Sequence, residues 1–297
     1  WRDRRSLVRT VHHGQGAILS SPFYLDALNP AGTYYSVNPM KGIKWLLNKK
    51  QTVKVFGGEA CMWTEAVSFD TVDSRIWPRI AAIAERFWSP EYITDVNCMY
   101  ERLRELNQKL THTGVEHLTG YISKLKTFTG EHSISDPLKT LADVCEGRRG
   151  KNPSRTLQYN SQLPLTSFID IIQPESETAV YLQSLIVYVP FNNIVKHILT
   201  ETFTEWTNNH AKLQMTLFYN RSLSDVLATL SENLSQVGNI GSKIMTSLHR
   251  EQEITTEQVW RYTDKLNKME HEVFEVRLSA VAVIRKLLEE IEVDKTD

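Results

Sequence analysis

The sequence predicts an α/β segment followed by an all-α helical bundle. In residues 1–122, short apolar runs that suit buried strands alternate with stretches of helical periodicity. That order is typical of βαβ units with a parallel sheet. In residues 176–297, apolar side chains recur every three or four positions, as on the buried faces of packed helices. Residues 123–175 are less regular, and we assign them to an irregular connecting segment.

Two short apolar runs are the predicted strands. The first is AILSS, residues 17–21, which follows a glycine and stops before a proline. The second is VKVFGG, residues 53–58, which ends in two glycines. The stretch between them, MKGIKWLLNKK at residues 40–50, has a helical pattern. We therefore expect the two strands to be parallel, joined by a helical crossover.

Two helices are predicted after the second strand. The first covers SRIWPRIAAIAERFW, residues 74–88, and the second follows it directly. Each has one apolar stripe, formed by Ile76, Ile80, Ile83 and Phe87 in the first and by Met99, Leu103, Leu106 and Leu110 in the second. We interpret both stripes as core packing and give them no functional weight.

The last part of the chain predicts long helices. Residues 222–225 fit an S-x-x-D helix start, and residues 255–258 fit a capping box. One stripe predicts a single continuous helix of about nine turns: Val259, Tyr262, Leu266, Met269, Val273, Val276, Ala280, Val283, Leu287 and Ile291. A second stripe is formed by Leu223, Leu227, Leu230, Leu234 and Val237. We expect Gly238 and Gly241 to weaken this helix in its middle. We expect these apolar stripes to be buried inside the bundle. The alternative is that they form the interface of a homodimer.

Composition excludes several classes of function. The formal net charge of −1 creates no global field for nucleic acid or an anionic membrane. No apolar run reaches the roughly 18 residues that span a bilayer. The histidines have no metal-ligand spacing, so we expect no metal and no cofactor.

Cys61, Cys98 and Cys145 are an odd number of cysteines, and we expect buried free thiols. The chain starts at Trp1 without a signal-peptide pattern, and we expect a fragment or a processed product.

Chemistry-bearing residues follow each of the two predicted strands. SSPFYLD, after the first strand, offers Tyr24 and Asp26. GGEACMWTE, after the second, offers Glu59, Trp63 and Glu65. In a parallel α/β barrel the active site gathers at the carboxyl ends of the strands. Carboxylates accept hydrogen bonds from sugar hydroxyls and an indole packs on the C–H face, so the set suits a sugar ring.

Spacing alone leaves other interpretations open. Asp26 and Glu65 suit the acid and nucleophile of an ordinary glycosidase. They equally suit helix caps, or partners of arginines on a rim. The basic loop GRRGKNPSR, residues 147–155, suits a solvated surface better than an anionic ligand.

One long motif resembles a known enzyme family. The run GGEACMWTEAVSFDTVDSRIWPRIAAIAERFWS, residues 57–89, resembles the final strand and helix of family 20 β-N-acetylhexosaminidases, in which a GGE-x-x-x-W-x-E motif precedes WPR…AER-x-WS. ILSSPFYLD, residues 18–26, resembles the preceding strand of that family, which ends in Tyr-x-Asp. Residues 1–2 stand where the strand before that ends. From LADVCEGRRGKNPSR, residues 141–155, onward there is a weaker likeness to the helical extension of Bacteroidetes-type members.

The resemblance implies a fold and an activity. The fold would be the C-terminal part of a (β/α)8 TIM barrel, its strands seven and eight with their helices, followed by the all-α domain. The activity would be hydrolysis of terminal non-reducing N-acetyl-D-hexosamine residues from β-N-acetylhexosaminides. In this retaining mechanism the substrate's own acetamido oxygen attacks the anomeric carbon, which is an exception to the two-carboxylate scheme. The implied partner is an N-acetylhexosamine-terminated glycan, and the implied location is periplasmic, outer-membrane-associated or secreted.

The resemblance also assigns roles to residues. Trp1 and Trp63 would line the pocket of the N-acetyl methyl group, and Tyr24 would donate a hydrogen bond to the acetamido oxygen. Asp26 and Glu65 would bind hydroxyls on the O4/O6 side.

The family's Asp-Glu pair, whose Glu protonates the leaving oxygen, belongs to an earlier strand that this sequence does not contain. We therefore expect no catalytic residue and no activity in this chain alone, and poor independent folding of its first 120 residues. The alternative is a catalytically inactive relative whose bundle serves protein–protein interaction or dimerisation.

Overall fold

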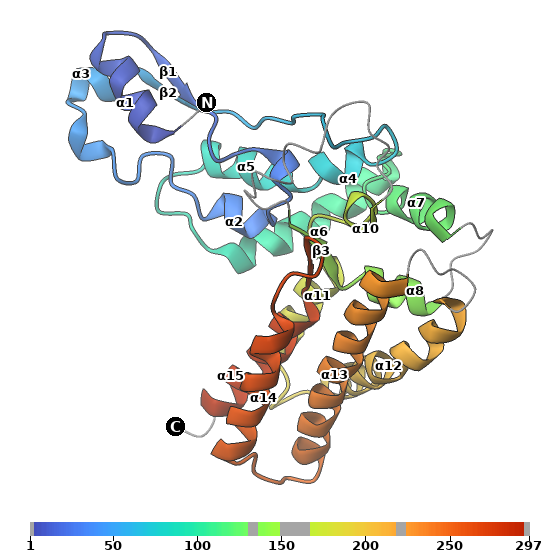
Figure 1. The fold of residues 1–297 in the computed structure, drawn as a ribbon. Helices are drawn as coiled ribbons and strands as arrows, with labels where there is room; N and C mark the ends of the chain where they lie inside the picture. Colours follow the sequence, from blue (N-terminus) through green and yellow to red (C-terminus); the bar gives the residue numbers. More distant parts are fainter. Residues whose placement is uncertain (1–2, 130–135, 149–166, 218–223, 294–297) are drawn as a thin grey trace. The chain divides into compact units, whose positions relative to one another are not determined.

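The computed structural model describes residues 3–129, 136–148, 167–217 and 224–293 (Figure 1). It divides the chain into two compact units. Described residues 3–121 belong to the first unit, and the described residues from 122 onward belong to the second. Helices dominate both units, and the described strands form two separate two-stranded sheets.

The first unit is built around a small parallel sheet. Strand β1 (Ala17–Leu19) pairs with strand β2 (Val55–Gly58) in parallel, with Leu19 opposite Gly58. The predicted parallel pairing of these two segments is confirmed. The helices of this unit are α1 (Arg4–His12), η1 (Leu25–Ala27), α2 (Ala31–Tyr35), η2 (Lys44–Leu46), α3 (Lys49–Thr52), α4 (Val72–Ile76), α5 (Arg79–Trp88) and α6 (Val96–His112).

Apolar side chains from α1, β1 and α5 form the main core of the first unit. Its buried members are Leu7, Val8, Val11, Leu19, Phe23, Leu25, Tyr34, Ile43, Leu47 and Ile83. Phe23, which follows β1, meets Phe87 of α5 edge to face, with ring centroids 4.6 Å apart, a favourable aromatic geometry. This contact fixes the segment after β1 against α5.

Two predicted helices of the first unit are shorter than their patterns indicate. The helical pattern of residues 40–50 is divided between η2 and α3, because Asn48 caps a new helix by accepting the backbone N–H of Gln51. The single helix predicted over residues 74–88 is wrong, since α4 and α5 are separated at Trp77-Pro78. Trp77 is extended, as expected before a proline, whose ring disfavours helical backbone at the preceding residue.

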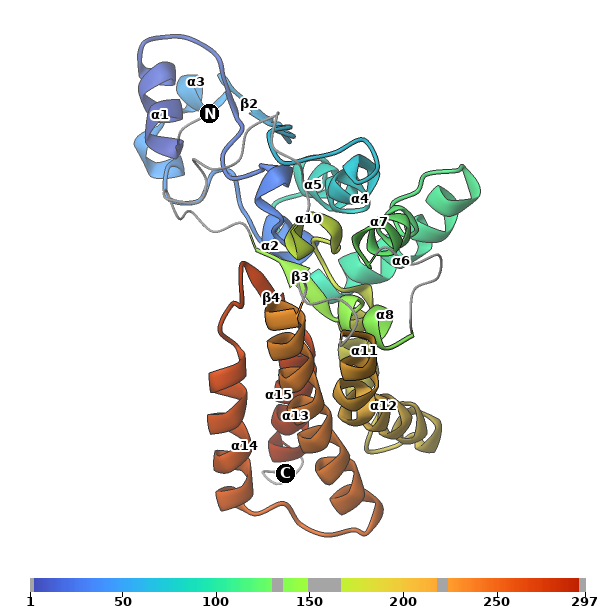
Figure 2. The same ribbon diagram turned by 45° about the vertical axis from the view of Figure 1, so that its right-hand side comes forward.

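The second unit contains long helices and a second small sheet. Its elements are α7 (Gly120–Thr129), which begins in the first unit, α8 (Asp136–Ala142), β3 (Cys145–Gly147), α10 (Phe168–Ile171), α11 (Glu177–Ile186), α12 (Asn193–Leu217), α13 (Ser224–His249), α14 (Thr256–Met269), β4 (Val276–Leu278) and α15 (Ala280–Val293). Helices α13, α14 and α15 run side by side in both ribbon views (Figures 1 and 2).

The predicted capping box at residues 255–258 is confirmed at the start of α14. Leu223 and the first residues of the predicted helix start at 222–225 lie outside the described residues.

Helix α13 runs unbroken through the two glycines that we expected to weaken it. A Cβ atom at Gly238 would stand 2.5 Å from the backbone nitrogen of Thr207 and 2.8 Å from the carbonyl oxygen of Phe203 on α12. At Gly241 it would stand 2.7 Å from the Phe203 ring. These glycines therefore allow close approach of α12 to α13, and the packing offsets their low helix propensity.

The continuous nine-turn helix predicted near the C-terminus is wrong. Helix α14 ends at Met269, and α15 starts only at Ala280, after strand β4. Val273 and Val276 exchange two backbone hydrogen bonds around Phe274 and Glu275, whose φ angles are 50° and 65°. Two successive positive φ values define the tight turn that joins hairpin strands. Strand β4 then pairs antiparallel with β3.

The three cysteines are free, and they differ in exposure. Cys145 is buried and Cys61 is half-buried, but Cys98 is exposed in the first turn of α6. The expectation of buried thiols is therefore wrong for Cys98, which lies on the solvent-facing side of an amphipathic helix. Among the helices that the structure describes, none is long and apolar enough to cross a membrane.

Candidate functional site

Backbone hydrogen bonds join the two segments that follow β1 and β2. The Glu59 N–H donates to the Leu19 carbonyl at 3.0 Å, and the Cys61 N–H donates to the Phe23 carbonyl at 3.0 Å. In return, the Leu25 N–H donates to the Cys61 carbonyl at 2.8 Å. The two segments therefore continue the parallel alignment of the strands, and a parallel bridge between Tyr24 and Cys61 extends it. This alignment brings the two predicted clusters of polar residues to one place.

Asp26 and Trp63 meet across the two segments. Asp26 is half-buried in the 3-10 helix η1, and its Oδ1 accepts the backbone N–H of Trp63 at 3.4 Å. The Trp63 side chain is 51% exposed. The exposed indole offers an apolar platform, and the carboxylate that contacts the backbone of the same residue offers a hydrogen-bond acceptor.

The phenol of Tyr24 is kept in its protonated form. Burial raises the pKa of Tyr24 above its ordinary value, and the charges of Asp26 and Glu59 raise that pKa further, against a smaller lowering by a hydrogen bond with Ser21. A protonated tyrosine hydroxyl is a hydrogen-bond donor. At neutral pH, Tyr24 therefore offers a donor to a ligand next to the acceptor of Asp26.

Glu59 contacts the first segment through a side chain. The buried Ser20 hydroxyl donates to the Glu59 carboxylate. Burial raises the pKa of the neighbouring Cys61 thiol, and the charge of Glu59 raises it further. Cys61 is thus a neutral thiol, and the negative charge at this point is the carboxylate of Glu59.

The remaining predicted site residues are less closely joined. Glu65 is exposed, two positions after Trp63. Within the described part of the chain, no hydrogen bond or ion pair joins Glu65 to Tyr24 or Asp26. Trp1 lies outside the described residues.

Sequence reasoning missed two residues that support the site. The Tyr34 hydroxyl donates to the Tyr24 carbonyl, and the Arg79 guanidinium donates to the carbonyls of Leu25 and Asn29. Both side chains are buried. The local sequence pattern does not reveal these supporting roles, because the stretch that contains Arg79 predicts only an amphipathic helix. The only available signal was the position of Arg79 in the WPR motif.

The chemistry of this site is that of a binding surface for hydroxyl and amide groups. One hydroxyl donor, carboxylate acceptors and an exposed indole lie on two adjoining segments. In the described ranges, no group of three or more His, Cys, Asp or Glu side chains is arranged to hold a metal ion.

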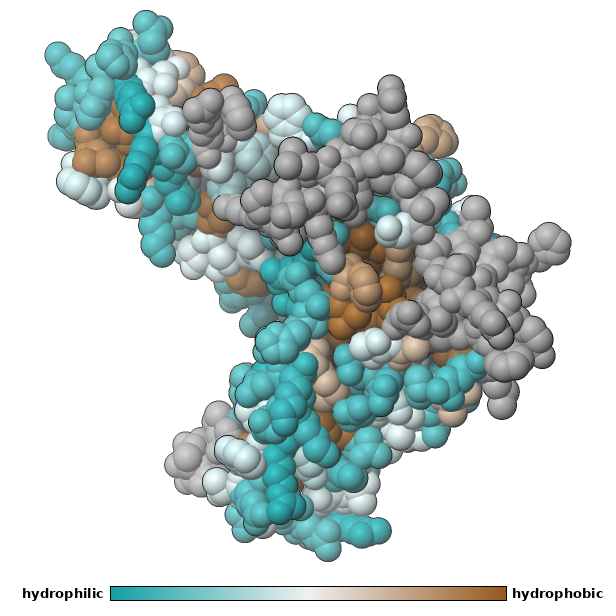
Figure 3. All heavy atoms as spheres, viewed as in Figure 1, coloured by the Kyte–Doolittle hydropathy of each residue, from teal (hydrophilic) through white to brown (hydrophobic). Residues whose placement is uncertain are grey.

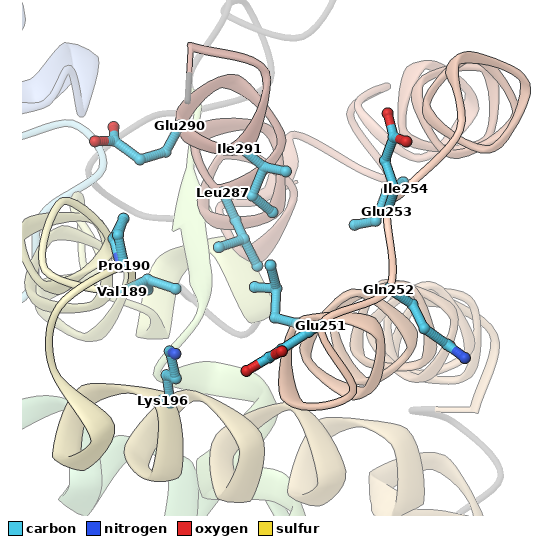
Figure 4. Close-up of a pocket in the computed structure, with 11 residues that line it drawn as sticks. Val189, Pro190, Lys196, Glu251, Gln252, Glu253, Ile254, Leu287, Glu290 and Ile291 are labelled. Atoms are coloured by element: carbon cyan, nitrogen blue, oxygen red, sulfur yellow. The ribbon is translucent and has the colours of Figure 1, made fainter. Parts of the chain in front are cut away.

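A cavity of about 290 Å³ lies in the second unit. Figure 4 shows Leu287 and Ile291 of α15 lining it together with Val189 and Ile254 from two other segments. Its remaining lining residues are Pro190, Lys196, Leu248, Glu251, Gln252, Glu253 and Glu290. The lining combines apolar side chains with charges of both signs, so its chemistry selects no ligand class. The strand-end residues of the first unit are the better candidate.

Comparison with protein families finds a match for the first unit. Residues 1–91 match the family model described as glycosyl hydrolase family 20, catalytic domain. The chain is similar to beta-hexosaminidase subunit beta of Mus musculus, with 38% identity over 112 residues, which cover 37% of this chain and 20% of that protein. It is also similar to subunit beta of Homo sapiens, with 33% identity over 121 residues, which cover 39% of this chain and 21% of that protein.

A solved structure is similar over nearly the whole chain. The X-ray structure of Flavobacterium johnsoniae chitobiase matches with a TM-score of 0.76 and 28% identity. The match covers 97% of this chain and 44% of that chain. The aligned part of the chain thus spans about a fifth of the length of the curated relatives and less than half of the chitobiase.

Proposed function

We propose that the chain supplies part of the sugar-binding pocket of a β-N-acetylhexosaminidase, because residues 1–91 match the family model of the glycosyl hydrolase family 20 catalytic domain. The reaction is hydrolysis of terminal non-reducing N-acetyl-D-hexosamine residues by substrate-assisted retaining catalysis. The observation that carries the proposal is the meeting of Tyr24, Asp26 and Trp63 where β1 and β2 end.

The acetamido group of the substrate is the reacting group in this mechanism. Its carbonyl oxygen attacks the anomeric carbon while the bond from that carbon to the leaving oxygen breaks, and the leaving oxygen takes its proton from the catalytic acid. The protonated Tyr24 hydroxyl donates to the acetamido oxygen and holds it in an attack-ready position. Trp63, together with Trp1, packs against the acetamido methyl group.

The outer hydroxyls of the sugar are bound by carboxylates. Asp26 and Glu65 accept hydrogen bonds from the hydroxyls on the O4/O6 side. Asp26 is held by its contact with the Trp63 backbone, whereas Glu65 is exposed. On this assignment the two carboxylates bind substrate, and neither acts as the acid.

The fold that we propose is the last part of a (β/α)8 barrel at residues 1–122, a connecting segment at 123–175, and an all-α domain at 176–297. Exposed apolar residues of the small sheet support the barrel. Ile18 of β1 is 51% exposed and Phe56 of β2 is 72% exposed, although parallel sheets are normally covered on both faces. Figure 3 shows apolar residues at the surface in the region of α1, β1 and β2. Further barrel strands would cover these side chains.

The catalytic acid, on this proposal, comes from sequence outside these 297 residues. The family's Asp-Glu pair has no counterpart among the residues that follow β1 or β2. We expect the purified 297-residue chain to release no p-nitrophenol from p-nitrophenyl N-acetyl-β-D-glucosaminide. Measurable release by the chain would overturn this part of the proposal.

The pocket assignment is tested in the longest natural protein that contains this sequence. Trp63→Ala and Asp26→Asn should each lower kcat/KM by roughly 10- to 100-fold. Trp45→Ala is the matched control, because Trp45 is an exposed tryptophan of the same unit outside the site, and it should leave kcat/KM unchanged. Equal effects of Trp63→Ala and Trp45→Ala would refute the pocket.

A further inference from the structure

Arg79 is a buried cation whose hydrogen bonds go to the loop that carries Asp26. Its side chain is 1% exposed at the start of α5. Nη1 donates to the Asn29 carbonyl at 2.8 Å, and Nη2 donates to the Leu25 carbonyl at 2.9 Å. Nη2 also donates to the Arg75 carbonyl of the preceding helix, α4. One guanidinium therefore connects α5 to the backbone on both sides of Asp26.

Tyr34 secures the same loop one residue earlier. Its hydroxyl donates to the Tyr24 carbonyl, and its ring centroid lies 5.9 Å from Cζ of Arg79. Within that distance a guanidinium is attracted to the face of an aromatic ring. Three carbonyls of the loop, at residues 24, 25 and 29, are thus held by two side chains that contact each other.

The backbone of this loop needs such support. Leu28 has a φ of 55°, a left-handed conformation that is unfavourable for residues with a Cβ atom, because Cβ comes too close to the following carbonyl oxygen. Conformations of this kind persist only where the surrounding structure fixes them. Arg79 supplies two of the fixing bonds on either side of the turn.

From this geometry we infer that Arg79 is a positioning residue for the Tyr24–Asp26 loop. It acts through the loop backbone and does not touch the sugar. The inference rests on the proposed function, because the loop matters for catalysis only if Tyr24 and Asp26 bind the substrate. The planar fork of arginine reaches two carbonyls at once, whereas the single ammonium of lysine keeps the charge but not this geometry.

The experiment compares amide hydrogen exchange with and without Arg79→Lys in the longest natural protein that contains this sequence. Exchange of the amides at 23–29 should rise about tenfold, because the bonds to two carbonyls are weakened. Exchange within α6 should not change. Arg102→Lys is the matched control, since Arg102 pairs with Glu85 of α5 and makes no bond to the loop. An unchanged rate at 23–29, or an equal rise throughout the first unit, would overturn the inference.

If Arg79→Lys does not fold, the unsubstituted chain still decides the question. In low urea, the amides at 23–29 should open together with the first turn of α5, because Arg79 joins the two segments. A local, urea-independent opening of 23–29 while α5 stays protected would also overturn the inference.

A kinetic measurement separates this inference from the proposed function. In the longest natural protein that contains this sequence, Arg79→Lys should lower kcat/KM by roughly 10- to 100-fold at temperatures where both proteins are folded. Arg102→Lys should not lower it. If the unsubstituted protein has no hexosaminidase activity, the proposed function fails, and the exchange experiment still tests whether Arg79 holds the loop.

Discussion

The carboxylate of Asp26 accepts a hydrogen bond from the backbone N–H of Trp63, with 3.4 Å between the oxygen and the nitrogen. This bond crosses between the segment after β1 and the segment after β2. It fixes the position of the Trp63 backbone relative to η1, while the indole itself remains half exposed. A residue that we assign to sugar hydroxyls thus also orders the residue assigned to the acetamido methyl group.

Substitution of Asp26 should separate these two effects. Asp26→Asn retains an oxygen that can accept the Trp63 N–H, whereas Asp26→Ala removes the acceptor. We expect the Trp63 amide to exchange about fivefold faster in Asp26→Ala than in Asp26→Asn, the equivalent of one modest hydrogen bond. Amide exchange followed by NMR measures this difference. Equal rates in the two variants would show that the bond does not order Trp63.

His117 should make the first unit less stable in mild acid. The imidazole is buried, with Nε2 3.0 Å from Oδ1 of Asn107, and burial lowers its pKa below the ordinary value near 6.5. The unfolded chain then binds a proton at a pH where the folded chain does not. Stability from this group is therefore complete above about pH 6.5 and is lost as the pH falls through the folded pKa.

Urea unfolding at pH 5 and pH 7.5 tests the histidine prediction. His117→Gln should reduce the loss of unfolding free energy between the two pH values. His112→Gln, at an exposed position of α6, should leave that loss unchanged. The prediction fails if both variants keep the pH dependence of the unsubstituted chain.

Gly238→Ala should destabilise the second unit even though alanine is the better helix former. The added methyl group would meet the backbone of α12 at 2.5 Å, and such overpacking costs about 1–3 kcal/mol. The control is Asn239→Ala, at the next and exposed position of α13, which should be neutral or stabilising by up to about 0.7 kcal/mol. Urea unfolding followed by circular dichroism gives both values. A stabilising Gly238→Ala would mean that the helices can move apart at no cost.

Glu146→Ala should be among the more damaging substitutions in the second unit. The Glu146 side chain is 5% exposed, pairs with Arg277 across β3 and β4, and accepts the Ser176 N–H at 3.1 Å. Removing it leaves both partners without this acceptor, at a cost of about 3 kcal/mol or more. Glu257→Ala breaks the exposed pair with Arg261 and should cost less than about 1 kcal/mol. Similar unfolding midpoints for the two variants would contradict this contrast.

Some features of the fold could be predicted because short sequence patterns specify the elements that form them. The parallel pairing of β1 and β2 followed from two apolar runs separated by a helical crossover. The start of α14 followed from Thr255 and Gln258, whose side chain and backbone groups are three positions apart. The nearness of Tyr24, Asp26 and Trp63 followed from their positions after two adjacent parallel strands.

Other features depend on contacts that periodicity does not reveal. The turn at Phe274 and Glu275 takes two positive φ values without Gly, Asn or Asp, the residues by which such a turn is normally recognised. Its stability comes from the pairing of β4 with β3, some 130 residues earlier in the chain. The glycines of α13 look unfavourable in isolation, and only the approach of α12 explains them.

The sequence by itself determined the family motif, the two strands and the residue types at their ends. Local propensity and spacing are sufficient for these, because strand register carries the same alignment into the segments that follow. Only the tertiary structure decided which side chains hold those segments in place. Arg79 and Tyr34 reach the loop from other elements, and the direction and burial of a long side chain depend on the packing around it.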